Sequence, residues 1–328
     1  MKDVLHRAGF NREDSPQERK GCWCWRWCLP MLQSLPFYPS AKATTVPVLW
    51  VPLLVIYVLA DKLHRFVAGI FIPQYHYPYV VALCFAQVVL SLLVLNLLHL
   101  LRLVSLKRCS RALGGERLLV PAVCGGAQAV MALWARANSS ADGGLFPLAA
   151  CLLPLVTAGW SHTLRLAAPP SARATGLVGA LSGVSLVVTG SQATLSGTHP
   201  LEYLYAPLSL ILQGLALAWL AKVSEAQRHH PHNQQQASSL DLYYTHLVHQ
   251  SWVLGLLWLL HPDGPWWALT EGSWCCLLFH GYLLALLLLG AGLQCAVYLT
   301  AQRWSPLAAA LLSTGPELTG PLLSFYLY

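Results

Sequence analysis

Residues 77–101 read YPYVVALCFAQVVLSLLVLNLLHLL, an almost unbroken apolar run. About 20 such residues are enough to cross the hydrocarbon core of a bilayer as a helix. The run is followed directly by a basic segment that begins at Arg102. A long apolar run with a basic flank is typical of a membrane-spanning helix whose flank is cytosolic. This stretch therefore predicts both a span and its orientation.

The same pattern recurs along the chain of 328 residues. With 56% apolar residues, 10% charged residues and a mean hydropathy of +0.52, the chain differs from soluble domains, in which about 25% of residues are charged. We expect an all-α, polytopic membrane protein, with a cytosolic N-terminal tail (residues 1–43) and a transmembrane domain (residues 44–328). The nine predicted spans are Thr44–Leu63, Tyr77–Leu101, Leu118–Ala135, Leu145–Leu164, Gly176–Gln192, Tyr203–Ala221, Leu240–Leu260, Leu277–Thr300 and Pro306–Leu327.

Basic residues and a sequon give the orientation of these spans. All of the 20 Lys and Arg residues except Lys62, Arg65 and Arg136 fall in the tail or in alternate gaps between spans, which are cytosolic by the positive-inside rule. One of the opposite gaps holds Asn138-Ser139-Ser140, a glycosylation sequon that is modified only on a lumenal or extracellular face. The two signals agree. The net charge of +7 is therefore a topology signal, and nucleic-acid binding is not expected.

Cysteine and histidine clusters do not indicate a metal site. Cys22, Cys24 and Cys28 have no partner pair at zinc-ligand spacing, which leaves juxtamembrane palmitoylation and a disordered tail with an aromatic patch as alternatives. The histidines of residues 229–232 lie in a polar segment and fit a solvated linker, because clustered loop histidines alone fix no coordination geometry. We expect no metal, no cofactor and no catalytic residue, so an enzyme is not expected.

Polar residues inside the spans carry the functional information, because each is costly in lipid unless it faces a cavity or a partner. Glu317 lies between two Gly-Pro steps, Gly315-Pro316 and Gly320-Pro321, which we expect to interrupt the helix and free carbonyl groups. Transporters place ligands at such broken helices near the midplane. The alternative is a Pro-kinked packing helix whose carboxylate is protonated or paired.

Several segments, in order, match one family of transporters. Leu53–Pro78 contains Asp61-Lys62, Gly183-Val184 lies in the fifth predicted span, Lys222 follows the sixth, and SSLDLYYTHLV begins the seventh. These residues resemble the triose-phosphate and nucleotide-sugar translocators, solute carrier family 35 of the drug/metabolite transporter superfamily. The resemblance covers nearly everything after Thr44. It implies a ten-helix fold of two inverted five-helix repeats, of which this chain supplies nine predicted helices.

The resemblance also implies a function and a site. We expect a nucleotide-sugar antiporter of the Golgi membrane, or of the endoplasmic reticulum, that exchanges a nucleotide sugar for a nucleoside monophosphate and forms a homodimer. The family's Phe-Tyr-Asn-Asn motif aligns on Tyr243–His246 and its Gly-Ala-Leu-Asn-Lys motif on Gly315–Thr319. The expected substrate-binding residues are Lys62, Tyr243, Tyr244, Thr245, His246, Gly315 and Glu317.

Departures from the family's motifs keep a second hypothesis open. The amides of the Phe-Tyr-Asn-Asn motif are absent, and Glu317 and Thr319 stand where the other motif has an uncharged residue and a phosphate-facing lysine. Diphosphate recognition needs cations or convergent donors. The alternative is a divergent carrier of another solute, or a transport-inactive interaction partner.

The orientation predicts that Asn138 is lumenal. An epitope tag inserted beside Ser140 should survive protease added to sealed microsomes, because the membrane shields lumenal segments, and should be digested only after detergent is added. A tag in residues 1–43 is the control and should be digested in intact vesicles. Digestion of the Ser140 tag in intact vesicles, without detergent, would show that this segment is cytosolic and would contradict the predicted topology.

Overall fold

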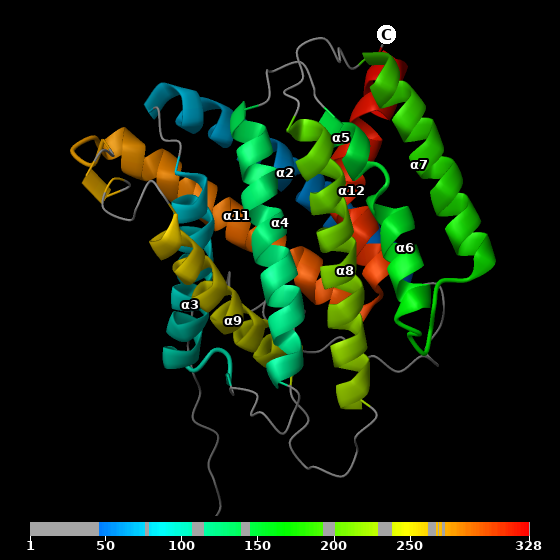
Figure 1. Ribbon diagram of the computed structural model, residues 1–328, viewed down its shortest axis with the longest axis horizontal. Coiled ribbons are helices and arrows are strands. Elements are labelled where there is room, and N and C mark those ends of the chain that lie inside the picture. Colours follow the sequence, from blue (N-terminus) through cyan, green and yellow to red (C-terminus); the bar gives the residue numbers. More distant parts are fainter. Residues whose placement is uncertain are drawn as a thin grey trace, which may run out of the picture. The chain divides into compact units, whose positions relative to one another are not determined.

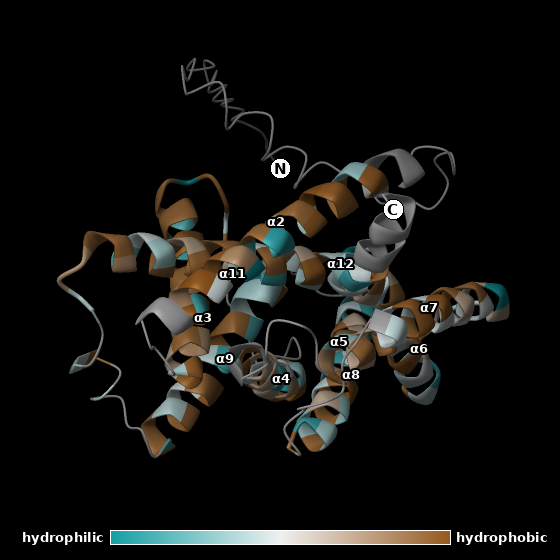
Figure 2. Ribbon diagram, turned by 90° about the horizontal axis from the view of Figure 1, so that it is seen from above, coloured by the Kyte–Doolittle hydropathy of each residue, from teal (hydrophilic) through white to brown (hydrophobic). Residues whose placement is uncertain are grey.

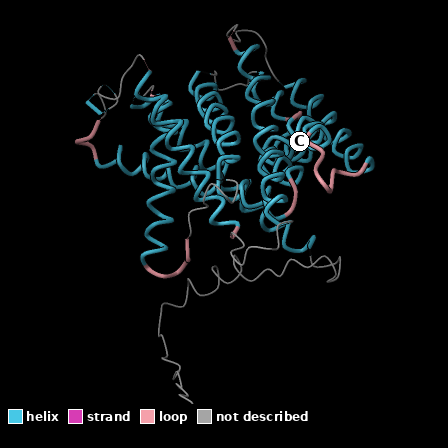
Figure 3. Tube along the Cα trace, turned by 60° about the horizontal axis from the view of Figure 1, so that its bottom comes forward, coloured by secondary structure: helices cyan, strands magenta, loops and turns pink. Residues whose placement is uncertain are grey.

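The computed structural model of the chain describes residues 46–75, 79–106, 115–138, 145–192, 201–228, 238–261, 267, 269–270 and 273–327. The chain divides into two units, Met1–Leu49 and Trp50–Tyr328, and nearly all described residues belong to the second. Within the described residues the regular structure is helical, without any strand (Figure 3). The predicted tail (1–43) and the histidines of residues 229–232 lie outside them.

The helices follow the predicted apolar stretches (Figure 1). Their limits differ from the predicted ones by a few residues in most cases. The α-helices are α2 (Val46–Tyr75), α3 (Val80–Leu100), α4 (Leu119–Asn138), α5 (Leu145–Ala150), α6 (Leu153–Thr163), α7 (Ala172–Gln192), α8 (Glu202–Arg228), α9 (Ser239–Leu260), α11 (Leu277–Arg303) and α12 (Pro306–Leu327), and the 3-10 helix η2 (Gly115–Leu118) precedes α4.

Among the described residues, five helices are long and apolar enough to cross a membrane. These segments are Val80–Leu100, Glu116–Ala135, Ala172–Ser191, Glu202–Gln227 and Leu277–Arg303. Large apolar side chains on them are exposed, as at Leu177 and Val187 of α7, and Figure 2 shows hydrophobic residues along most helices. The all-α class is confirmed, and the apolar helices fit a multi-pass membrane protein. The count of nine spans remains a prediction.

Helices α4 and α8 make the most extensive contact in the second unit. Helices α3, α9 and α11 pack against one another, with α3 and α9 also on α4, whereas α6 and α12 pack against α8. The ring of Trp134 in α4 lies 4.9 Å from that of Tyr205 in α8, and the indole of Trp219 donates a hydrogen bond of 3.0 Å to the carbonyl of Arg117. The pair α4 and α8 therefore joins the two groups of helices, which also meet directly where α11 packs against α12.

The fourth predicted span, Leu145–Leu164, is two short helices instead of one. Helix α5 ends at Ala150, Cys151 and Leu152 form a turn, and α6 begins at Leu153. Pro154 explains the break, because proline has no N–H to donate and its ring clashes with the carbonyl four residues earlier. Proline is accepted in the first turn of a helix, and Pro154 lies there in α6.

Two other expectations about helix ends are wrong. Helix α2 does not end near Leu63 but continues to Tyr75, because the charges of Asp61 and Arg65 are paired with each other one turn apart and need no helix end. Helix α12 is continuous through both Gly-Pro steps. A proline removes only one hydrogen bond of the helix, and the hydroxyl of Thr314 donates to the carbonyl of Ala310 at 2.8 Å in the turn before Pro316.

The close approach of α6 and α8 occurs at Gly214. A Cβ atom at this position would lie 3.0 Å from Val156 Cγ1, 3.3 Å from Trp160 Cδ1 and 3.4 Å from the backbone nitrogen of Thr157. Gly183 in α7, by contrast, is exposed and would meet nothing within 4 Å. Glycine at residue 214 is therefore required by packing, and glycine at residue 183 is not.

We predict that Gly214→Val destabilises the protein, because a larger side chain would force α6 and α8 apart. Overpacking of this kind costs about 1–3 kcal/mol, which thermal unfolding of the purified protein should detect. Gly183→Val is the matched control and should leave the unfolding temperature nearly unchanged. Equal unfolding temperatures for the two variants would contradict the packing described at Gly214.

Candidate functional site

A cavity of about 270 Å³ lies among the helices of the second unit. Its walls come from α2, α3, α4, α8, α9, α11 and α12, together with residues on either side of the break between α5 and α6. Most of the titratable side chains in its lining are acidic, basic or histidine side chains. They are Asp61, His64, Arg65, His246 and Glu317 from three helices, with Tyr57, Tyr298 and Cys84 beside them.

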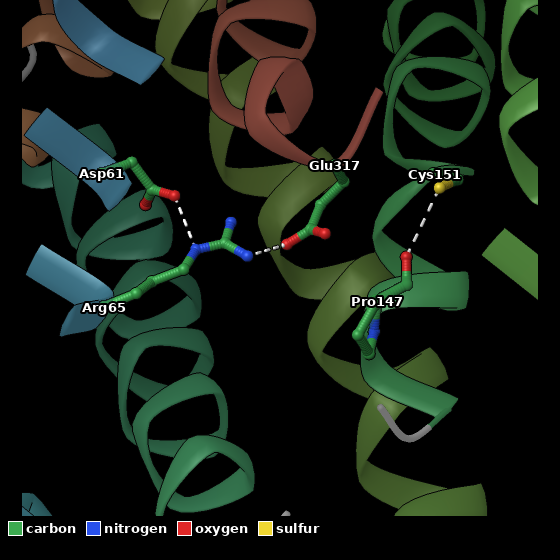
Figure 4. Close-up of polar contacts among 5 residues, drawn as sticks. All are labelled: Asp61, Arg65, Pro147, Cys151 and Glu317. Carbon is green, nitrogen blue, oxygen red and sulfur yellow. Dashed lines mark hydrogen bonds and ion pairs between the residues drawn. The ribbon is translucent and has the colours of Figure 1, made fainter. Parts of the chain in front are cut away.

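Arg65 joins α2 to α12 across one side of this cavity (Figure 4). Its Nε atom lies 2.6 Å from Oδ2 of Asp61, and its Nη1 atom lies 2.6 Å from Oε1 of Glu317. We call these three residues the charge triad. Hydrogen bonds between ionised partners are shorter and about twice as strong as neutral ones. With all three groups ionised, the charge triad has two negative charges and one positive charge.

The local sequence of α2 and α12 explains how the charge triad forms. Asp61 and Arg65 are four residues apart, so they lie on the same face of α2. Gly315 brings the two helices together, since a Cβ atom there would lie 2.9 Å from Cδ1 of Leu54 in α2. The carboxylate of Glu317, two residues later, can then reach the guanidinium of Arg65.

Aromatic rings form a second part of the lining. The ring centroid of Tyr298 in α11 lies 4.5 Å from the ring centroid of His246 and 4.9 Å from that of Tyr243. His246 and Tyr243 both belong to α9. His246 and Tyr298 line the cavity, and the buried Nδ1 atom of His246 has no hydrogen-bond partner within the described part of the chain. A flat ring and a polar nitrogen are therefore available beside each other.

Of the predicted substrate-binding residues, His246 and Glu317 line the cavity. Gly315 lies at the contact between α2 and α12. Tyr243 is fully buried behind Tyr298. Lys62, the expected phosphate-facing cation, is exposed, and the basic side chain that the structure brings to the cavity is that of Arg65.

The remaining predicted residues are engaged elsewhere. The hydroxyl of Tyr244 donates to Oδ1 of Asn96 at 3.3 Å, and the hydroxyl of Thr245 donates to the carbonyl of Asp241 at 2.8 Å within α9. Asn138 is the last residue of α4, and its side chain, with Ser139 and Ser140, lies outside the described residues. The use of this sequon stays a prediction.

The sequence contained two signals for lining residues that were missed. Tyr57, Asp61 and His64 follow the spacing i, i+4, i+7, which places them on one face of a helix. Single glutamines inside apolar runs, such as Gln87 and Gln128, are costly in lipid and also reach the cavity. The polar part of the lining is thus ionic, amide and aromatic, among a larger number of apolar residues.

A metal site is not formed by the described residues, among which no group of three or more His, Cys, Asp or Glu side chains is arranged to hold an ion. The arrangement can instead bind a polar solute through hydrogen bonds, ring stacking and charge. Comparisons with protein-family models and with curated proteins find no match for this chain.

We predict that Arg65→Gln lowers thermal stability, because Asp61 and Glu317 would keep their charges without a partner. The loss should exceed the about 1 kcal/mol of an exposed ion pair and remain below the about 3–5 kcal/mol of a fully buried one, since Arg65 is 37% exposed. Lys62→Gln, on the same helix, is the control and should unfold like the unaltered protein. Adding Asp61→Asn and Glu317→Gln to Arg65→Gln should restore part of the loss, and a lack of any restoration would contradict the ionic origin of the effect.

Proposed function

We propose that this chain is a membrane transporter, a divergent member of solute carrier family 35 with nine spans of the ten-helix inverted-repeat plan. The proposed activity is exchange of a nucleotide sugar for a nucleoside monophosphate across the Golgi membrane, with the endoplasmic reticulum as the alternative location. The observation that carries the proposal is a cavity among apolar helices whose lining includes charged side chains and glutamine amides.

The composition of the lining supports transport over a purely structural role. Charged residues within membrane helices are expensive and usually mark ion or substrate pathways. The charge triad joins α2 and α12, which are far apart in the sequence. Relative movement of such helices would open or close the cavity, as alternating access requires.

The charge triad also favours a second candidate function, a carrier of a neutral or cationic solute. Arg65 is the basic side chain in the described lining of the cavity, and its guanidinium forms ion pairs with two carboxylates. A diphosphate would have to replace Glu317 at the guanidinium and would meet the repulsion of the released carboxylate. A cation or a neutral polar solute would meet no such repulsion.

The variant Glu317→Gln distinguishes the two functions. In proteoliposomes loaded with nucleoside monophosphate, nucleotide-sugar exchange should persist or increase, because an amide replaces a repelling charge and Arg65 keeps only Asp61 as an anionic partner. If the solute is cationic, the same variant should lose most of its uptake, because the attracting charge is gone. A panel of labelled nucleotide sugars and labelled organic cations measures both activities in one preparation.

A matched control for this experiment is Glu225→Gln. Glu225 lies in α8 and accepts hydrogen bonds from the backbone nitrogen of Ala167 at 2.9 and 3.1 Å, outside the lining of the cavity. The Glu225→Gln variant should leave the uptake of nucleotide sugars and of organic cations unchanged. Failure of the unaltered protein to exchange any nucleotide sugar, in a stably inserted state, would exclude the antiporter proposal.

A further inference from the structure

Glutamines occupy isolated positions in five apolar helices and converge at the cavity. We call Gln87 (α3), Gln128 (α4), Gln213 (α8), Gln250 (α9) and Gln294 (α11) the amide network. All of these except Gln250 line the cavity, and Gln250 is fully buried. No glutamine belonged to the expected substrate site, so the amide network is a feature that the family's motifs do not supply.

The amide network consists of two separate hydrogen-bonded groups, and its hydrogen bonds differ in length. The amide of Gln294 donates to Oε1 of Gln250 at 2.9 Å, an ordinary length for N–H···O. The bond from Gln87 to Gln294 is 3.3 Å and the bond from Gln128 to Gln213 is 3.5 Å, both longer than the usual range. Gln250 therefore fixes Gln294, whereas the other cavity-lining amides are held weakly and can exchange their partner for a solute.

Glycine makes room for one of these amides. A Cβ atom at Gly290 would lie 2.6 Å from Oε1, 2.8 Å from Cδ and 3.1 Å from Nε2 of Gln87. No side chain could therefore occupy residue 290 while Gln87 keeps its place. Gly292, two residues further along α11, is exposed and would meet nothing within 4 Å. The absence of a side chain at Gly290 is thus specific to the position of the Gln87 amide.

Helix packing alone does not explain the amide network. The Nε2 atom of Gln250 is buried and has no hydrogen-bond partner among the described residues, and an unsatisfied buried donor opposes folding. Hydrogen bonds between membrane helices contribute only modestly to their association, and the two bonds at the cavity are long. Stability therefore gives little reason for amides at these positions.

An amide presents a donor and an acceptor side by side, and its charge is zero. Its best partner is a neutral group that also presents a donor next to an acceptor, as the edge of a nucleobase or a pair of sugar hydroxyls does. A phosphate has only acceptors and is better held by a cation. The amide network and the charge triad line the same cavity, so its lining offers both neutral and ionic groups to a solute.

We propose that the amide network is a binding subsite for the neutral, hydrogen-bonding part of the solute, a nucleobase edge or sugar hydroxyls, and that Gly290 positions the Gln87 amide for this contact. The inference rests on the proposed transport function and specifies which part of the solute the cavity recognises without charge. Arg65 and the carboxylates paired with it then face the remaining part of the solute.

The test compares Gly290→Ala with Gly292→Ala in the purified full-length protein. Dissociation constants are measured for UMP and for ribose 5-phosphate, which share a phosphate and ribose and differ in the base, and for uridine and glucose, which carry no charge. Gly290→Ala should weaken binding by about tenfold, the effect expected for the loss of one good hydrogen bond, whereas Gly292→Ala should bind like the unaltered protein. Gln87→Leu should reproduce the loss, and it carries the test if Gly290→Ala does not fold.

The panel of ligands distinguishes whether the amide network contacts the base or the sugar hydroxyls. A loss for UMP but not for ribose 5-phosphate assigns the subsite to the base. An equal loss for both, accompanied by a loss for uncharged uridine or glucose, assigns it to hydroxyls. Unchanged affinities together with a lower unfolding temperature in Gly290→Ala and Gln87→Leu would mean that the amides only join helices, and the proposal would be overturned. It would also be overturned if no ligand of the panel bound the unaltered protein.

The outcomes also separate this inference from the proposed antiport. Binding of uridine or glucose that depends on Gln87, without exchange of nucleotide sugars in proteoliposomes, would keep the subsite and exclude the antiporter. Exchange of nucleotide sugars that is equally fast in Gly290→Ala, Gln87→Leu and the unaltered protein would keep the antiporter and exclude the subsite.

Discussion

The ion pair between Arg65 and Glu317 is the constraint on which the cavity depends. It holds α2 to α12 at a separation of 2.6 Å between Nη1 and Oε1, next to Gly315, where the helices approach closely. Charges in an apolar surrounding interact strongly, but only partners with good geometry compensate for their lost hydration. Because Asp61 holds the other side of the guanidinium, Arg65 has a fixed direction into the cavity.

The same constraint shapes what the cavity can bind. A guanidinium between two carboxylates attracts an anion less than a free lysine would. The charge triad by itself therefore discriminates only weakly between solutes. Selection then depends on neutral groups, among them the glutamine amides and the adjacent rings of His246 and Tyr298. Ala150 and Leu153, on either side of the break between α5 and α6, add apolar side chains to the lining.

Much of the fold could be predicted from the sequence, because apolar runs of sufficient length have few alternatives to a helix in lipid. Residues 77–101 and 306–327 were predicted almost to their limits. Helix ends were predicted less well where a charged residue or a proline was expected to end or interrupt a helix. Asp61 marks no end because a partner one turn away neutralises it, and Pro316 leaves α12 continuous, whereas Pro154 coincides with a real break.

By itself the sequence determined the helical class, because apolar length acts locally and needs no knowledge of neighbours. It also predicts a side for each gap from the distribution of basic residues. Only the tertiary structure decided which polar residues face one another. Lys62 and Arg65 are almost adjacent in the chain, yet one is exposed and the other lines the cavity. Gln87 and Gln294 meet across more than two hundred residues, and such pairs depend on helix rotation and packing, which no local pattern specifies.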